Sequence, residues 1–92
     1  MKMFKYVMPN LGRITIDMHG DKNNPPVIRF FGFDPMGNMC LWAEVNDALG
    51  RVGRVIETIG TGHPIPDGHY IGTIRHADTF MWHAYDLGAL DG

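Results

Sequence analysis

The residues best suited to binding chemistry lie in a glycine- and proline-rich loop, Gly60-Thr-Gly-His-Pro-Ile-Pro-Asp-Gly68. Its glycines leave room for backbone amides to approach a ligand, and successive amides in such a turn form an anion-binding nest. The histidine precedes a proline, which favours an extended backbone at that position. A stiff loop of this kind loses little entropy on binding. We therefore predict a ligand- or partner-binding site whose loop residues are Gly60, Thr61, Gly62, His63 and Asp67.

The same loop also has a purely structural interpretation. It can join two strands as a rigid connection without contacting any ligand. It is not a phosphate-binding P-loop, because no Gly-Lys-Ser/Thr follows the glycines. Both interpretations, a binding site and a structural connection, stay open at this point.

Histidines are the next candidates, and the chain has five of them: His19, His63, His69, His76 and His83. Zinc requires three or four converging ligands, and no pair of these histidines has the close spacing of a metal motif. We therefore predict no metal site and no cofactor. We expect His83 to be a partly buried strand residue, and we assign it, together with Trp82, to the predicted binding site.

The aromatic side chains have two interpretations. In a domain this small we expect them first of all to form the core, and the residues concerned are Phe30, Phe31, Phe33, Trp42, Tyr70 and Trp82. Aromatic rings exposed beyond that core would instead mark a partner surface or stack on a nucleotide base.

No pattern of side chains indicates catalysis. Cys40 stands beside Leu41 and Trp42, and we interpret it as a small buried hydrophobe rather than a nucleophile. The carboxylates that could be paired for hydrolysis have the positions of turn or strand-end residues, and these are Asp67, Asp78 and Asp86. We predict that the protein is not an enzyme.

Composition narrows the choice of partners and compartment. The formal net charge of the 92 residues is −2, and the eight Lys and Arg residues are scattered rather than grouped in a stripe. This argues against generic nucleic-acid binding. The single cysteine is typical of a reducing compartment, and no apolar segment is long enough to cross a membrane. A cytoplasmic location is the expectation.

The elements that must position these residues are strands. Apolar alternation and turn residues predict seven strands, at 2–8, 13–18, 27–33, 39–45, 52–59, 69–75 and 79–85. Consecutive members are expected to pair as hairpins, namely 2–8 with 13–18, 27–33 with 39–45, and 69–75 with 79–85. Segment 27–33 is apolar on both faces, so we expect it to be covered on both sides. Gly53 is predicted at a β-bulge, and residues 46–54 are the one place where a short helix is an alternative.

These elements predict an all-β fold. Seven strands joined by short turns make a small antiparallel barrel or a compact two-layer sandwich. Residues 1–92 form one domain, with 88–92 as a flexible tail. A homodimer is a further expectation, because small β domains often finish burying their surface by pairing two copies.

Five stretches together resemble a known family. They are Phe4-Lys-Tyr6 with Met8-Pro9, Cys40-Leu-Trp-Ala-Glu-Val45, Ile59-Gly-Thr-Gly-His-Pro-Ile-Pro66, Tyr70-Ile-Gly-Thr73 and Phe80-Met-Trp-His-Ala-Tyr85. In this order and spacing the chain is similar to short proteins of tailed phages and prophages that are classed as a domain of unknown function. The resemblance spans nearly the whole chain, except for residues 19–26 and 46–52.

The resemblance implies a phage accessory protein in the bacterial cytoplasm and supplies no catalytic residue. Accessory proteins of this size commonly regulate host processes or inhibit host defence, including CRISPR–Cas complexes. We therefore expect a non-enzymatic protein that binds and modulates a bacterial host protein or complex, as an anti-CRISPR does. The alternative is a protein that binds a small nucleotide or signal molecule through the Gly60–Pro66 loop.

Overall fold

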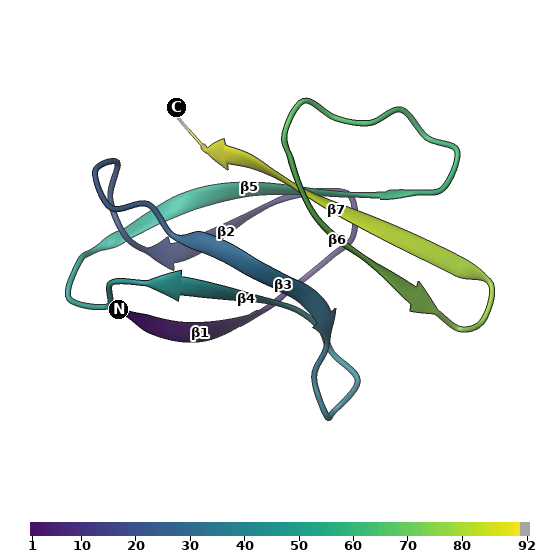
Figure 1. Ribbon diagram of the computed structural model, residues 1–92, viewed down its shortest axis with the longest axis horizontal. Helices are drawn as coiled ribbons and strands as arrows, with labels where there is room; N and C mark the ends of the chain where they lie inside the picture. Colours follow the sequence, from purple (N-terminus) through teal and green to yellow (C-terminus); the bar gives the residue numbers. More distant parts are fainter. Residues whose placement is uncertain (91–92) are drawn as a thin grey trace.

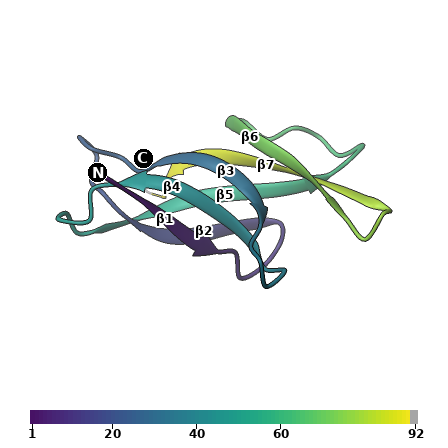
Figure 2. The same cartoon turned by 60° about the horizontal axis from the view of Figure 1, so that its bottom comes forward.

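Seven strands in two antiparallel sheets make up the computed structural model, which describes residues 1–90 (Figure 1). The strands are β1 (Lys2–Val7), β2 (Arg13–His19), β3 (Val27–Phe33), β4 (Met39–Val45), β5 (Arg51–Gly60), β6 (His69–His76) and β7 (Phe80–Ala89). Sheet A has the order β1-β4-β3, and sheet B has the order β2-β5-β7-β6. Sheet A lies over sheet B as the second layer (Figure 2). The all-β prediction is confirmed, and of its two forms the sandwich is the one observed.

The predicted first hairpin is wrong. β1 pairs with β4, and β2 pairs with β5, so the two strands belong to different sheets. The connection between them crosses the sandwich: Met8 is buried and its N–H donates to the Met39 carbonyl over 2.9 Å. An alternating strand buries one face whether its neighbour lies beside it or in the facing sheet, so the local pattern does not distinguish the two arrangements.

The other two hairpins are confirmed. β3 pairs with β4, and β6 pairs with β7. The turn between β3 and β4 contains Pro35 and a glycine, Gly37, with φ +83°, as its sequence predicts. The turn between β6 and β7 instead uses two residues other than glycine with positive φ, Ala77 and Asp78.

Asp34 accepts the hydrogen bonds that organise the β3–β4 turn, and its ionisation should affect the pH dependence of stability. Its buried carboxylate accepts hydrogen bonds from Lys5 Nζ at 2.9 Å and from the Asn38 N–H at 2.8 Å, and these donors hold its pKa well below the usual value. A carboxyl with a lowered pKa stabilises the fold above its unfolded pKa of about 4, and this stabilisation is lost as the pH falls below that value. We expect Asp34→Asn to flatten the acid limb of stability between about pH 4 and about pH 2. Urea unfolding across that range, with Asp17→Asn as control, measures this, and an unchanged acid limb in Asp34→Asn contradicts it.

Register irregularities lie elsewhere than predicted. Gly53 pairs regularly with Asp17, and a side chain there would meet Thr15 Cγ2 at 3.0 Å, which explains the glycine without a bulge. The register shifts occur in β3, in β6 and in β7, where Val55 faces Gly88 and the next residue, Ile56, faces Asp86. Residues 46–50 form a turn, and no helix occurs within residues 1–90.

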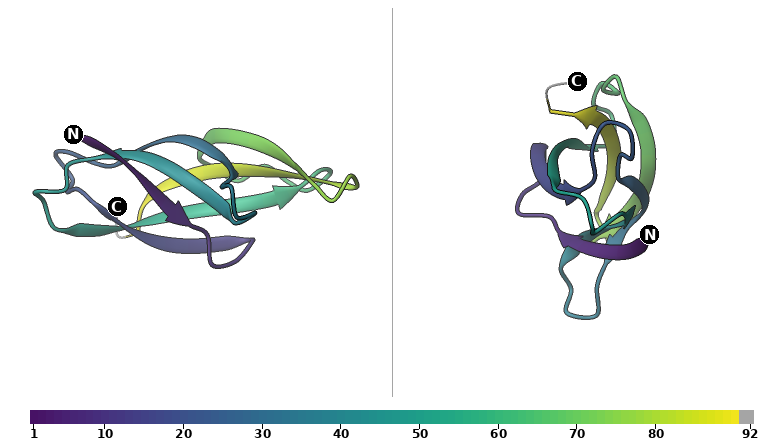
Figure 3. Two further views of the ribbon diagram at one scale, coloured as in Figure 1. Left: turned by 90° about the horizontal axis from the view of Figure 1, so that it is seen from below. Right: turned by 90° about the vertical axis from the view of Figure 1, so that its left-hand side faces the viewer.

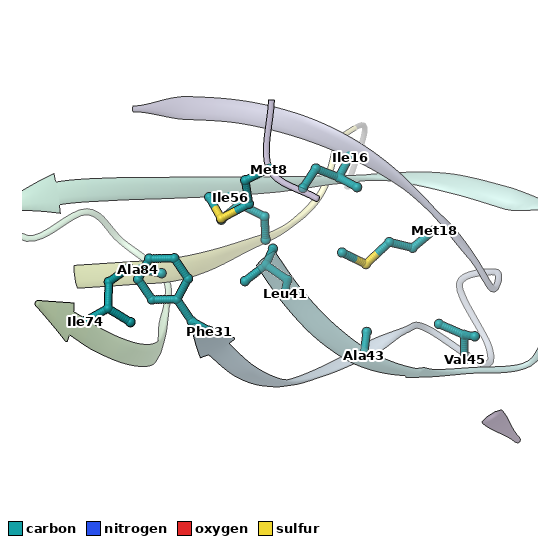
Figure 4. Close-up of a cluster of buried hydrophobic side chains, with 10 residues drawn as sticks. All are labelled: Met8, Ile16, Met18, Phe31, Leu41, Ala43, Val45, Ile56, Ile74 and Ala84. Carbon is teal, nitrogen blue, oxygen red and sulfur yellow. The ribbon is translucent and has the colours of Figure 1, made fainter. Parts of the chain in front are cut away.

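Ten buried apolar side chains form the core between the sheets (Figure 4): Met8, Ile16, Met18, Phe31, Leu41, Ala43, Val45, Ile56, Ile74 and Ala84. Cys40 is buried, as predicted, and burial is the main reason that its thiol pKa is raised. The predicted aromatic core is confirmed in part, because Phe31 lies in this cluster and Trp82 packs against it. Phe30, Phe33 and Tyr70 are exposed instead, and β3, which was expected to be covered on both sides, is an edge strand.

β7 extends further than predicted. Gly88 and Ala89 belong to this strand, and the Leu90 N–H donates to the Gly53 carbonyl over 3.0 Å. The predicted flexible tail at 88–92 is therefore wrong for residues 88 and 89, which belong to β7. Residues 91 and 92 lie outside the described part of the chain.

Unequal strand lengths determine where the candidate site lies. β5 and β7 have 10 residues each, whereas the strands of sheet A have 6 or 7. Sheet B therefore extends past sheet A at the end where β5 leaves for the 61–68 loop and the β6–β7 hairpin turns (Figure 3). We call this part, residues 58–66 and 79–83, the uncovered end.

Candidate functional site

The loop begins with a tight turn at the uncovered end. The His63 N–H donates to the Gly60 carbonyl over 3.3 Å, and Gly62 has φ +95°, a conformation that favours glycine. The imidazole of His63 folds back over Gly60, because a Cβ placed on Gly60 would lie 3.5 Å from His63 Cδ2. The turn thus uses the His63 amide, one of the donors expected in an anion-binding nest.

A chain of hydrogen bonds connects the loop to the outer face of sheet B. His83 Nε2 lies 2.9 Å from Thr61 Oγ1, and His83 Nδ1 lies 2.8 Å from Thr73 Oγ1. Thr73 in turn shares a hydrogen bond with the Tyr70 hydroxyl. A neutral imidazole donates from one ring nitrogen and accepts at the other, and hydroxyls can serve both. These hydrogen bonds therefore tie the loop to β6 and β7. Both ring nitrogens of His83 contact hydroxyl groups, whereas a catalytic triad holds its histidine with a carboxylate.

Three open hollows meet around Gly60 and His63. One of about 230 Å³ lies against Thr61, Ile65 and His83 on the outer face. A second of about 430 Å³ lies between Gly12, Pro64 and Trp82. The third, of about 500 Å³, lies along Phe80, Met81 and Trp82 at the hairpin tip.

Exposed apolar side chains surround these hollows. Ile65 is 71% exposed, Phe80 is 56% exposed, and Met81 is also exposed. The rings of Phe80 and Trp82 stack at 6.1 Å with an interplanar angle of 19°. Such a cluster of apolar groups, at one end of a small domain, is typical of a protein-binding surface.

The structure brings together six of the seven predicted site residues: Gly60, Thr61, Gly62, His63, Trp82 and His83. Asp67 is exposed further along the loop and lines none of the three hollows. Sequence reasoning missed the part played by Thr73, Phe80 and Met81. The observed register of the β6–β7 hairpin places Thr73 directly opposite His83. The predicted turn at 76–78 would instead place Thr73 opposite Met81, so the predicted bounds did not reveal this pair.

Within residues 1–90, no three His, Cys, Asp or Glu side chains come together as a metal-binding group. In the same part of the chain, no helix has the length and apolar character needed to cross a membrane.

Comparison with known proteins identifies a family. A family model described as a domain of unknown function (DUF7352) matches residues 1–90. No curated protein and no solved structure matches the chain.

Proposed function

The chain belongs to the DUF7352 family, a domain of unknown function, and we propose that it is a non-enzymatic binding protein that docks a partner protein on its uncovered end. We further propose that it is an accessory protein of a tailed phage or prophage. In this proposal it acts in the cytoplasm of the bacterial host, where it modulates or occludes a host protein or complex, as an anti-CRISPR does.

One observation carries the binding proposal: the exposed apolar side chains of the uncovered end gather around hollows that a partner can fill. Phe80 and Met81 come from a hairpin, and Ile65 comes from a loop whose first residue, Thr61, is hydrogen-bonded to His83, so the elements that carry the surface are ordered before binding. A preorganised surface loses little conformational entropy on association.

The phage and host parts of the proposal rest on the resemblance of the Gly-Thr-Gly-His-Pro-Ile-Pro loop and the four other stretches to short phage proteins. Small size and the lack of a metal-binding group of side chains within residues 1–90 agree with an accessory role. The homodimer stays a prediction, and sedimentation of the wild-type protein tests it.

Differential capture tests the proposed function. Tagged wild-type protein, Phe80→Ser and Phe30→Ser are incubated with bacterial lysates, and bound proteins are identified by mass spectrometry. The proposal expects a defined host protein that wild type and Phe30→Ser retain and Phe80→Ser loses. If no captured protein depends on Phe80 in hosts that support such phages, the proposal is wrong.

A small-molecule site is the second candidate, and the outer-face hollow favours it. This hollow has a volume suited to one ring, and Thr61 and His83 supply hydroxyl and imidazole groups at its wall. A nucleotide bound there at one hundred times its dissociation constant is expected to raise the free energy of unfolding by about 2.7 kcal/mol. Thermal melts across a nucleotide library measure this, and flat melting temperatures throughout the library exclude it.

A further inference from the structure

The edge of β5 is open at the uncovered end. β2 begins at Arg13, which pairs with Glu57, whereas β5 continues to Gly60. The last residues of β5 therefore have a neighbouring strand on the β7 side alone. The hollow of about 430 Å³ lies on the other side of these residues, where a longer β2 would run.

Two backbone groups point into this hollow. The Thr58 N–H donates to the Gly12 carbonyl over 3.0 Å, so the peptide groups of Thr58 and Gly60 face the β2 side of the strand. The Gly12 N–H binds the Thr58 hydroxyl at 2.7 Å instead of the Thr58 carbonyl. The Gly60 carbonyl is used by the turn to His63. This leaves the Thr58 C=O as an acceptor and the Gly60 N–H as a donor.

The hollow contains one carboxylate, that of Glu57. Glu57 is the one Asp, Glu, Lys or Arg side chain among its lining residues, and His63 is the other ionisable group. Arg13 Nε donates to Glu57 Oε1 over 2.6 Å, and Oε2 accepts no hydrogen bond from the residues that the structure describes. An occupant with a positive charge complements this site, and Trp82 and Pro64 provide apolar surface beside it.

We propose that this hollow binds the free amino terminus of a partner polypeptide. The α-ammonium group donates to the Thr58 carbonyl and to Glu57, and the carbonyl of the first residue accepts from the Gly60 N–H. In a parallel pair of strands, the N–H and C=O of one residue bond in the same way to two residues of the other strand, those before and after the residue opposite. Gly12 closes one end of the hollow beside β5, so the first residue of the bound peptide must lie next to Gly12. The inference rests on the proposed function, because the partner supplies the terminus.

Short peptides with free and blocked termini test the inference. Tetrapeptide amides that begin with Ala, Leu, Met or Phe, and their N-acetyl counterparts, are titrated into ¹⁵N-labelled protein and followed by NMR. We expect the free peptides to shift the amides of residues 58–63 and the Trp82 indole. Acetylation is expected to weaken binding about tenfold or more, because it removes a charge-assisted hydrogen bond. Glu57→Gln is expected to weaken binding of the free peptides, and the control Asp17→Asn, on the same outer face, is expected not to.

Three results overturn the inference. They are equal binding of acetylated and free peptides, shifts confined to other residues, and no binding of any peptide up to about 10 mM. Each of these leaves the proposed function standing if the Phe80-dependent host protein is still captured, so the two proposals can fail separately.

Discussion

Replacing Asp86 with alanine is expected to lower the free energy of unfolding by about 3–5 kcal/mol. Asp86 holds Arg54 through Oδ1 at 3.0 Å and Oδ2 at 3.1 Å, and its Oδ1 also accepts the Gly88 N–H at 2.9 Å. The two side chains are 10% and 17% exposed, so removal of the carboxylate leaves a guanidinium with little access to water. Such a loss is a large part of the stability of a domain of this size. Urea denaturation of the purified variant measures it.

A matched exposed pair and a double variant serve as controls for Asp86. Glu44→Ala removes the carboxylate of an exposed ion pair with Arg29, and we expect little change in stability. Combining Asp86→Leu with Arg54→Met replaces both charges by apolar groups and is expected to recover most of the loss. If Asp86→Ala costs no more than Glu44→Ala, the pair does not stabilise the fold in the way argued.

Replacing Phe80 with serine is expected to weaken binding of the captured host partner by about 30-fold or more. Phe80 is 56% exposed and stacks on Trp82, so it offers a partner a large apolar surface without holding the core together. Titration calorimetry with the purified partner gives the affinity. Thermal unfolding of the variant alone is expected to stay close to that of the wild type.

Phe30 provides an unusually close control for Phe80. It is 58% exposed, and its ring packs on Trp42 with the centroids 5.5 Å apart, but it lies on the outer face of sheet A. We expect Phe30→Ser to bind the partner like the wild type. Equal losses of affinity in the two variants would mean that exposed aromatic area in general, rather than the uncovered end, determines binding.

The local structure was predictable because alternation and turn residues act over a few neighbours. Ile14, Ile16 and Met18 face inward as the alternation predicts, and Gly37 has its positive φ because the turn requires it. The pairing of β1 was not predictable in this way. Its partner β4 is more than thirty residues away, and the burial of Phe4 and Tyr6 is the same in a hairpin as in a sandwich.

The candidate site was predictable in its loop but not in its surroundings. Gly62 and His63 stand out by type, whereas Phe80 looks like an ordinary strand aromatic until sheet A is seen to end before it. Phe30 also reads as core, but its ring lies on the outer face of sheet A, which no other element covers within residues 1–90. Exposure of an aromatic residue depends on the relative lengths of the facing sheets, and the alternation within one strand does not contain that information.

Hydrogen–deuterium exchange of the protein, free and bound to the partner captured through Phe80, shows whether the uncovered end is the binding surface. We expect binding to slow amide exchange in residues 58–66 and 79–83 and to leave the strands of sheet A unchanged. Slowed exchange confined to β1, β3 and β4, with the uncovered end exchanging as fast as in the free protein, would contradict it.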